Sequence, residues 1–240
     1  ASPHSAQGRL QPYHGRLAPA PAAAARQGRL GLLHLPLCPY PAVGTRFLAF
    51  AERALLADEL VLSNTVEALA AALLLKGWHG IRKTLIVTPA SVKYQWGREI
   101  ERFTSESYVV VGGTKAKRAQ QYEQDSFFTV LNYELVLRDL DHLYELKPDL
   151  VILDEAQRIK NWRAKTSQAL KEMPRPFAFV LSGTPLENRL EELFSIVEFL
   201  DDRLLGPPWQ FMARHVVKDE WGGIIGYKDL PGVRRAIAPI

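Results

Sequence analysis

The chain has 240 residues, of which 47% are apolar and 23% charged, so it can bury the core of a sizeable domain and is not disordered throughout. Its single cysteine, Cys38, excludes an internal disulfide, and its six histidines show no paired spacing that would indicate a zinc site. The longest apolar run, 68–75, is much shorter than the roughly 18 residues needed to span a bilayer. We therefore expect a globular, cytoplasmic protein with no membrane partner.

Positive charge is concentrated at the start of the chain. Residues 1–50 contain five arginines and no acidic residue, whereas residues 51–240 contain 25 basic and 26 acidic residues. Residues 1–36 are rich in Ala, Pro, Gly and Arg and show no sustained period of two or 3.6, so we expect a disordered basic tail. Such a tail could attract phosphate backbones, or it could be a solvated segment without a partner.

From residue 37 onward, short apolar runs alternate with amphipathic stretches. The runs are typical of strands buried on both faces and lie at 54–58, 84–89, 108–113, 127–132, 150–155 and 177–183. The amphipathic stretches predict helices at about 65–76, 91–103, 115–123, 134–145, 162–172 and 187–200. This alternation predicts an α/β fold in which a parallel sheet has helices on both faces. Ligands of such sheets bind beyond the carboxyl ends of the strands.

Two acidic residues, Asp154 and Glu155, end the strand predicted at 150–155, and Gln157 follows them. An apolar strand that ends in two acids costs desolvation energy unless a cation or a hydrogen-bond donor meets them. In nucleoside triphosphatases of this fold, the first acid holds Mg²⁺ and the second polarises the attacking water. The alternative interpretation is an aspartate that caps a helix.

The next predicted strand ends in Ser182, Gly183 and Thr184, which should reach the same edge of the sheet. Small hydroxyl residues at that edge can relay a change at a γ-phosphate, or they can form a plain turn in which Pro185 opens a helix. The order of the segments TPASVKYQW, NYE, DEAQ and SGTPLEN along one chain favours the first interpretation.

This ordered set resembles the first RecA-like lobe of the Swi/Snf-type ATPases of helicase superfamily two, which translocate on duplex DNA. The resemblance covers residues 37–240 and includes LCPYPAVGTRFLAF, LLADELVLSNT, LIVTPASVKYQW, VLNYELV, VILDEAQRIKN and LSGTPLENRLEELFSIVEFL. It implies a P-loop NTPase fold with ATP and Mg²⁺ as cofactors. It also implies that Asp154, Glu155 and Gln157 are catalytic, that Thr65 and Asp154 hold the metal, and that Ser182, Gly183 and Thr184 couple the nucleotide state to movement.

The phosphate loop departs from the family pattern. Working members read D-E-M-G-L-G-K-T, whereas residues 58–65 read D-E-L-V-L-S-N-T, so that Val61 and Ser63 replace the glycines and Asn64 replaces the lysine. Glycines let backbone N–H groups close around phosphates, β-branched Val61 resists that conformation, and Asn64 is short and neutral. Only Thr65 keeps its expected part, as a hydroxyl ligand of Mg²⁺.

A second departure is Pro41, which stands where the family has a glutamine that reads the adenine edge. We therefore expect a degenerate nucleotide site in which ATP binding is weak or lost. The positions that would form this site are Pro41, Asp58, Glu59, Val61, Ser63, Asn64 and Thr65.

The segments implied to contact DNA are better preserved. A helix start at TPASVKYQW suits a phosphate, because its free N–H groups and dipole attract anions. The residues that the resemblance places against one DNA strand are Ser91, Lys93, Gln95, Trp96, Asn132, Tyr133 and Asn188. Packing in the core is the alternative for the rings of Trp96 and Tyr133.

The family's second RecA-like lobe carries arginines that complete the active site, and no segment of this sequence corresponds to it; Ile240 falls where the linker to it would begin. We therefore expect a truncated lobe, impaired in ATP binding and hydrolysis. Its expected partners are duplex DNA, with a nucleoid location when bound, and a second lobe encoded separately. Two alternatives remain open: a non-catalytic DNA- or protein-binding adaptor, and a decaying gene product without function.

Overall fold

The computed structural model describes residue 33 and residues 39–57, 61–183 and 189–238. Its main feature is a six-stranded sheet with the strand order β1-β6-β5-β2-β4-β3, in which every pairing is parallel. The strands are β1 (Arg53–Ala57), β2 (Thr84–Thr88), β3 (Tyr108–Val110), β4 (Phe128–Asn132), β5 (Leu150–Leu153) and β6 (Phe177–Ser182). All six predicted strands are present, which confirms the prediction of a parallel α/β sheet.

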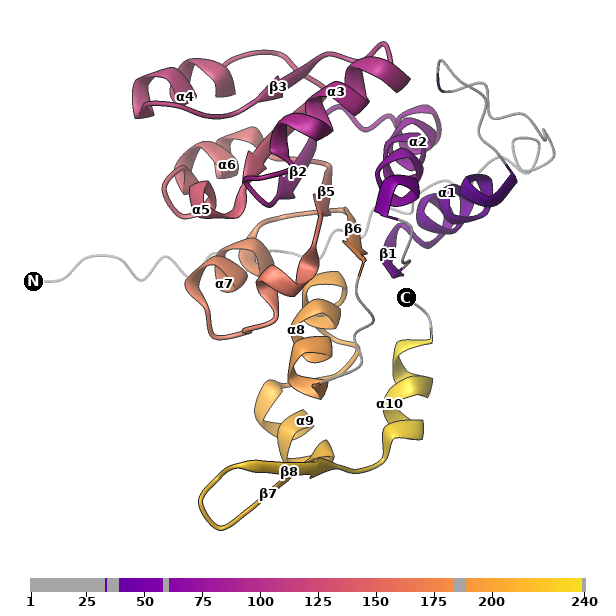
Figure 1. The fold of residues 1–240 in the computed structure, drawn as a ribbon, viewed down its shortest axis with the longest axis vertical. Helices are drawn as coiled ribbons and strands as arrows, with labels where there is room; N and C mark the ends of the chain where they lie inside the picture. The colour runs from indigo at the N-terminus through magenta and orange to yellow at the C-terminus, as the bar shows by residue number, and fades with distance from the viewer. Residues whose placement is uncertain (1–32, 34–38, 58–60, 184–188, 239–240) are drawn as a thin grey trace, which may run out of the picture.

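Helices connect these strands (Figure 1). They are α1 (Pro39–Ala51), α2 (Val61–His79), α3 (Lys93–Phe103), α4 (Lys115–Tyr122), α5 (Tyr133–Val136), α6 (Leu140–Leu146), the 3-10 helix η2 (Ala156–Ile159), α7 (Lys165–Glu172) and α8 (Leu190–Leu200). After α8 follow α9 (Pro208–His215), the antiparallel hairpin of β7 (Val216–Lys218) and β8 (Ile224–Tyr227), and α10 (Leu230–Ile237).

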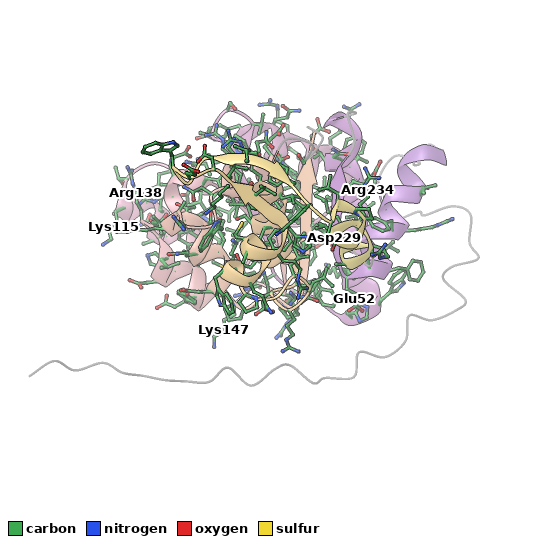
Figure 2. The ribbon with its side chains drawn as sticks, turned by 90° about the horizontal axis from the view of Figure 1, so that it is seen from below. Glu52, Lys115, Arg138, Lys147, Asp229 and Arg234 are labelled. Atoms are coloured by element: carbon green, nitrogen blue, oxygen red, sulfur yellow. The ribbon has the colours of Figure 1, made fainter. Side chains whose placement is uncertain are left out.

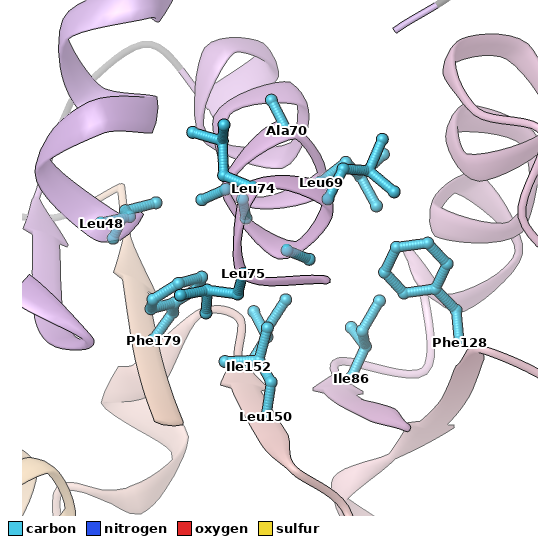
Figure 3. Packing of buried hydrophobic residues seen from close by; sticks show 14 of the residues in the cluster. Leu48, Leu69, Ala70, Leu74, Leu75, Ile86, Phe128, Leu150, Ile152 and Phe179 are labelled. Atoms are coloured by element: carbon cyan, nitrogen blue, oxygen red, sulfur yellow. The ribbon is translucent and has the colours of Figure 1, made fainter. Parts of the chain in front are cut away.

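The sheet is covered on both faces, because successive side chains of its strands enter two different apolar clusters. Ile86 and Ile152 belong to the cluster beneath α1, α2 and α3, whereas Val87 and Leu153 belong to the cluster beneath α5 to α8. Figure 3 shows leucines of α2, among them Leu75, above the first face of the sheet. Burial on both faces explains why the strands read as continuous apolar runs.

Two predicted helices differ in the structure. Helix α2 begins at Val61, four residues before the predicted start, and so includes the segment that resembles a phosphate loop. The helix predicted at 134–145 is divided into α5 and α6. Between them, the buried carboxylate of Asp139 accepts hydrogen bonds from Nε and Nη2 of Arg118, each 2.7 Å long, so a contact with α4 holds the chain where the helix is interrupted.

The elements after α8, and helix α1, were not predicted. Phe194 of α8, Phe211 of α9 and Val233 of α10 share a small apolar cluster of their own. Figure 1 places these elements below the sheet, and Figure 2 views the molecule from that side, with the yellow hairpin across the front. Apart from Leu33, which is buried in the cluster beneath α1 and α2, the tail predicted at 1–36 lies outside the described residues.

Candidate nucleotide and DNA site at the carboxyl edge of the sheet

The carboxyl ends of three strands, β4, β5 and β6, bring predicted site residues to one edge of the sheet. Strand β4 ends at Asn132, β5 leads into Asp154, and β6 ends at Ser182, which is buried and followed by the half-buried Gly183. The register between β2 and β5 pairs Val87 with Leu153, and the N–H of Asp154 donates to the carbonyl of Val87. This register places the residues that follow Val87 and Leu153 side by side.

Asp154 is held by three side chains. Its Oδ2 accepts hydrogen bonds from Thr88 Oγ1 at 2.8 Å and from Trp96 Nε1 at 2.7 Å, and its backbone carbonyl accepts one from Tyr133 OH at 2.8 Å. Burial raises the pKa of Asp154, the two side-chain hydrogen bonds oppose this, and the charge of Glu155 adds to it. Thr88 was not predicted as a site residue, although its place directly after an apolar run is the same signal that singled out Asp154.

Glu155 has a left-handed backbone with φ 51°, a conformation that costs a non-glycine residue energy and is enriched at functional sites. Its Oε2 accepts a hydrogen bond of 2.7 Å from Gln157 Nε2. Within the described part of the chain, the buried Oε1 of Gln157 has no hydrogen-bond partner. The DEAQ segment thus forms a tight turn that joins β5 to η2, in which the glutamine orients the second acid.

The start of α2 occupies the position of the predicted phosphate loop. Asn64, at the position of the family lysine, is only 4% exposed, and Thr65 is half-buried. Pro41 lies in α1, so the position expected to read the base belongs to a helix. Asp58, Glu59, Thr184 and Asn188, as well as the side chains of Pro41, Val61 and Ser63, lie outside the described residues.

Lys93 takes part in a buried polar network instead of facing solvent. It is 6% exposed, and its Nζ donates to the carbonyl of Val111 at 2.8 Å and to Asn132 Oδ1 at 2.9 Å. Burial lowers the pKa of Lys93, and Glu134 opposes this shift. Glu134, which was not predicted, accepts a hydrogen bond of 2.6 Å from Asn132 Nδ2, and this bond lowers its pKa.

The other residues predicted to contact DNA differ in accessibility. Ser91 is exposed and Gln95 half-buried at the start of α3, whereas the rings of Trp96 and Tyr133 are buried. Core packing, the alternative considered for the two rings, is what the structure contains. Their polar atoms both point to Asp154, so a link between α3 and the acidic edge accompanies the packing.

Comparison with known proteins identifies the family. The family model described as the SNF2-related domain matches residues 46–229. The chain belongs to the SNF2-related family. A solved structure, the Sulfolobus solfataricus SWI2/SNF2 ATPase core in complex with dsDNA, aligns with a TM-score of 0.76 and 27% identity, over 87% of this chain and 44% of that one.

Curated relatives are similar over part of their length. DNA repair and recombination protein RAD54B of Homo sapiens is 35% identical over 162 residues, which are 64% of this chain and 18% of the relative. The putative ATP-dependent helicase/translocase YwqA of Bacillus subtilis is 35% identical over 195 residues, which are 77% of this chain and 21% of that protein. The chain therefore spans about a fifth of the length of these two relatives.

Membership of the SNF2-related family confirms the resemblance to the Swi/Snf-type lobe and its RecA-like fold. In the described ranges, no helix is both long and apolar enough to cross a bilayer. Nor do those ranges contain a group of three or more His, Cys, Asp and Glu side chains arranged to hold a metal ion.

Proposed function

We propose that this chain is the N-terminal, ATP-binding-type lobe of a Swi/Snf-like DNA-dependent ATPase in which ATP binding and hydrolysis are impaired. The observation that carries the proposal is the replacement of the phosphate lysine by Asn64, beside an acidic edge that is otherwise intact. The chemistry of the family would be ATP hydrolysis coupled to translocation on duplex DNA. In this lobe, DNA binding is retained although ATP binding and hydrolysis are impaired.

The residues present fit Mg²⁺, but they do not fit the triphosphate. The carboxylates of Asp154 and Glu155 and the hydroxyl of Thr65 are oxygen donors of the kind that Mg²⁺ prefers. The phosphate cradle does not fit, because a helix that begins at Val61 bonds the N–H of Thr65 into its own turn. With Asn64 in place of lysine, the cradle also lacks a cation for the β- and γ-phosphates.

The loss of one charge-assisted hydrogen bond weakens a site by about 1.5–3 kcal/mol, which is roughly ten- to over a hundred-fold in affinity. Pro41 in α1 offers no side-chain amide to an adenine, so the expected loss affects both ends of the nucleotide. These two departures support weak or absent ATP binding, and no hydrolytic step is assigned to this chain.

Duplex DNA is the proposed partner. Support comes from the similarity to an ATPase core whose structure contains dsDNA, and from the start of α3. There, exposed Ser91 and half-buried Gln95 lie where a helix N-terminus favours a phosphate. A second RecA-like lobe is the proposed protein partner, since the family places completing arginines on such a lobe.

ATP turnover tests the proposal. We expect hydrolysis at background level, with or without duplex DNA, in a coupled assay that measures phosphate release. The variant Asp154→Asn is the matched control, because it removes the acid that a working site requires. Turnover that DNA stimulates and that Asp154→Asn abolishes would contradict the impaired site.

A further inference from the structure

We propose that a groove formed by the segment after η2, α8, α9 and the β7–β8 hairpin binds single-stranded nucleic acid. A hollow of about 630 Å³ is lined by Trp162 and Arg163, by Arg189, and by Lys218 of the hairpin. A neighbouring hollow of about 440 Å³ shares Trp162, Arg163 and Lys218 with it and extends to Trp209. The shared wall joins the two into one surface, called the hairpin groove below.

The hairpin groove has an excess of positive charge. Its basic side chains are Lys160, Arg163, Arg189 and Lys218. Lys160 is paired with Glu192 at 3.2 Å, and the other acid of the wall, Glu191, accepts a hydrogen bond of 3.1 Å from Tyr227 OH. Among the described residues, the remaining three cations form no ion pair with a carboxylate. Their charge is therefore available to a phosphate backbone.

Two tryptophans, Trp162 and Trp209, line the groove together with these cations. Trp209 is 73% exposed, and the guanidinium of Arg163 lies 4.8 Å from the centroid of the Trp162 ring. Trp221, at the tip of the hairpin, is 93% exposed. The turn that presents it is held by Asp219 Oδ1, which accepts the N–H groups of Trp221 at 3.0 Å and of Gly223 at 2.6 Å. Tryptophan is enriched at interaction surfaces, because its large apolar ring also carries a polar N–H.

Cations in the same groove as an exposed aromatic ring match the chemistry of a single strand. The cations follow the phosphates, while unpaired bases stack on the rings with little preference for sequence. The bases of a duplex are stacked on one another and offer only their edges, so they cannot use an exposed indole face. An acidic peptide could meet the cations, but it offers no flat group for the indoles. The hairpin groove is thus a second surface, separate from the duplex-facing start of α3.

The test measures fluorescence anisotropy of a labelled oligothymidylate of about 12 nucleotides, titrated with the full chain at low salt. Trp209→Ala should weaken binding roughly tenfold, whereas Trp209→Phe should keep most of it, because phenylalanine still stacks. Arg163→Gln and Lys218→Gln should each weaken binding and reduce the salt slope by about one. Phe47→Ala on α1 and Arg82→Gln before β2 are matched controls, since both side chains are exposed outside the groove.

Three results would overturn the proposal. The first is no oligothymidylate binding, or binding that Trp209→Ala leaves unchanged. The second is an equal loss of duplex and single-strand binding in Arg163→Gln, which would indicate a general electrostatic patch. The third is competition by polyglutamate as strong as by unlabelled oligothymidylate, which would indicate an acidic protein partner. Duplex binding measured in the same variants separates this proposal from the proposed function, because groove substitutions should leave it largely unchanged.

Discussion

Trp96 and Asp154 are joined by a hydrogen bond of 2.7 Å from the indole Nε1 to the carboxylate Oδ2, although 58 residues separate them in the sequence. Trp96 belongs to α3, the helix expected to face DNA, and Asp154 is the acid expected to hold Mg²⁺. Thr88 donates to the same oxygen at 2.8 Å. A displacement of α3 relative to β5 would therefore move the acid, or break the bond that holds it.

Removing the indole N–H should destabilise the fold. Trp96→Phe keeps an aromatic ring but leaves a largely buried carboxylate oxygen with one donor fewer, so we expect a loss of about 1–3 kcal/mol in unfolding free energy at neutral pH. Urea denaturation measures the loss. In an Asp154→Ala background the same substitution should cost clearly less, because no carboxylate is left to satisfy. Equal costs in the two backgrounds would show that the ring, and not its hydrogen bond, matters.

Asp154 should make stability depend on pH in a particular direction. Burial raises its pKa above the ordinary value of 3.8, so the folded state holds this proton more tightly than the unfolded state does. The loss of stability caused by ionising Asp154 in the folded state is absent below about pH 3.8. It grows as the pH rises through the raised pKa. Asp154→Asn keeps an acceptor for Thr88 and Trp96 and removes the buried charge, so it should stabilise the fold at pH 7.

Thermal unfolding of parent and Asp154→Asn across this pH range checks the sign. The two proteins should unfold at similar temperatures near the acidic end and diverge toward neutral pH. A parent chain that is the more stable of the two at pH 7 would mean that the hydrogen bonds outweigh burial in setting the pKa of Asp154.

Rebuilding the nucleotide site should recover binding. Val61→Gly and Ser63→Gly restore backbone freedom, Asn64→Lys restores the cation, and Pro41→Gln restores an amide for the base. Together they should give measurable Mg-ATP affinity in a titration with a fluorescent nucleotide. The same set with Asn64→Gln in place of the lysine is the control, because it restores length without charge. If the Mg-ATP affinity of the rebuilt variant does not exceed that of the parent chain, residues outside these two segments also prevent binding.

DNA affinity should divide into a term from the tail and a term from the lobe. Deleting residues 1–32, which leaves the buried Leu33 in place, removes four arginines, so the plot of log affinity against log salt should become flatter. Lys93→Ala should change that slope by less than about one, since the ammonium is buried against Val111 and Asn132. Equal affinity and slope for the full and shortened chains would identify the tail as a solvated segment.

The amino-acid sequence alone determined the layers of the fold and the edge where chemistry is expected. Continuous apolar runs such as 150–153 predict strands buried on both faces, and parallel strands bring their carboxyl ends together, so Asp154 and Ser182 could be assigned to one edge without coordinates. Both inferences depend on local pattern and on general rules for connecting strands.

Which groups meet at that edge was decided only by the tertiary structure. Periodicity shows that a residue is buried, but not what it contacts, because the partner depends on how the crossover helices pack. Thus Lys93, expected to face DNA, lies against Asn132, and Trp96 points its N–H to Asp154. The hairpin groove was not predicted for the same reason. Its cations and tryptophans come from separate segments between residues 160 and 218, which only the packing of α8, α9 and the hairpin brings together.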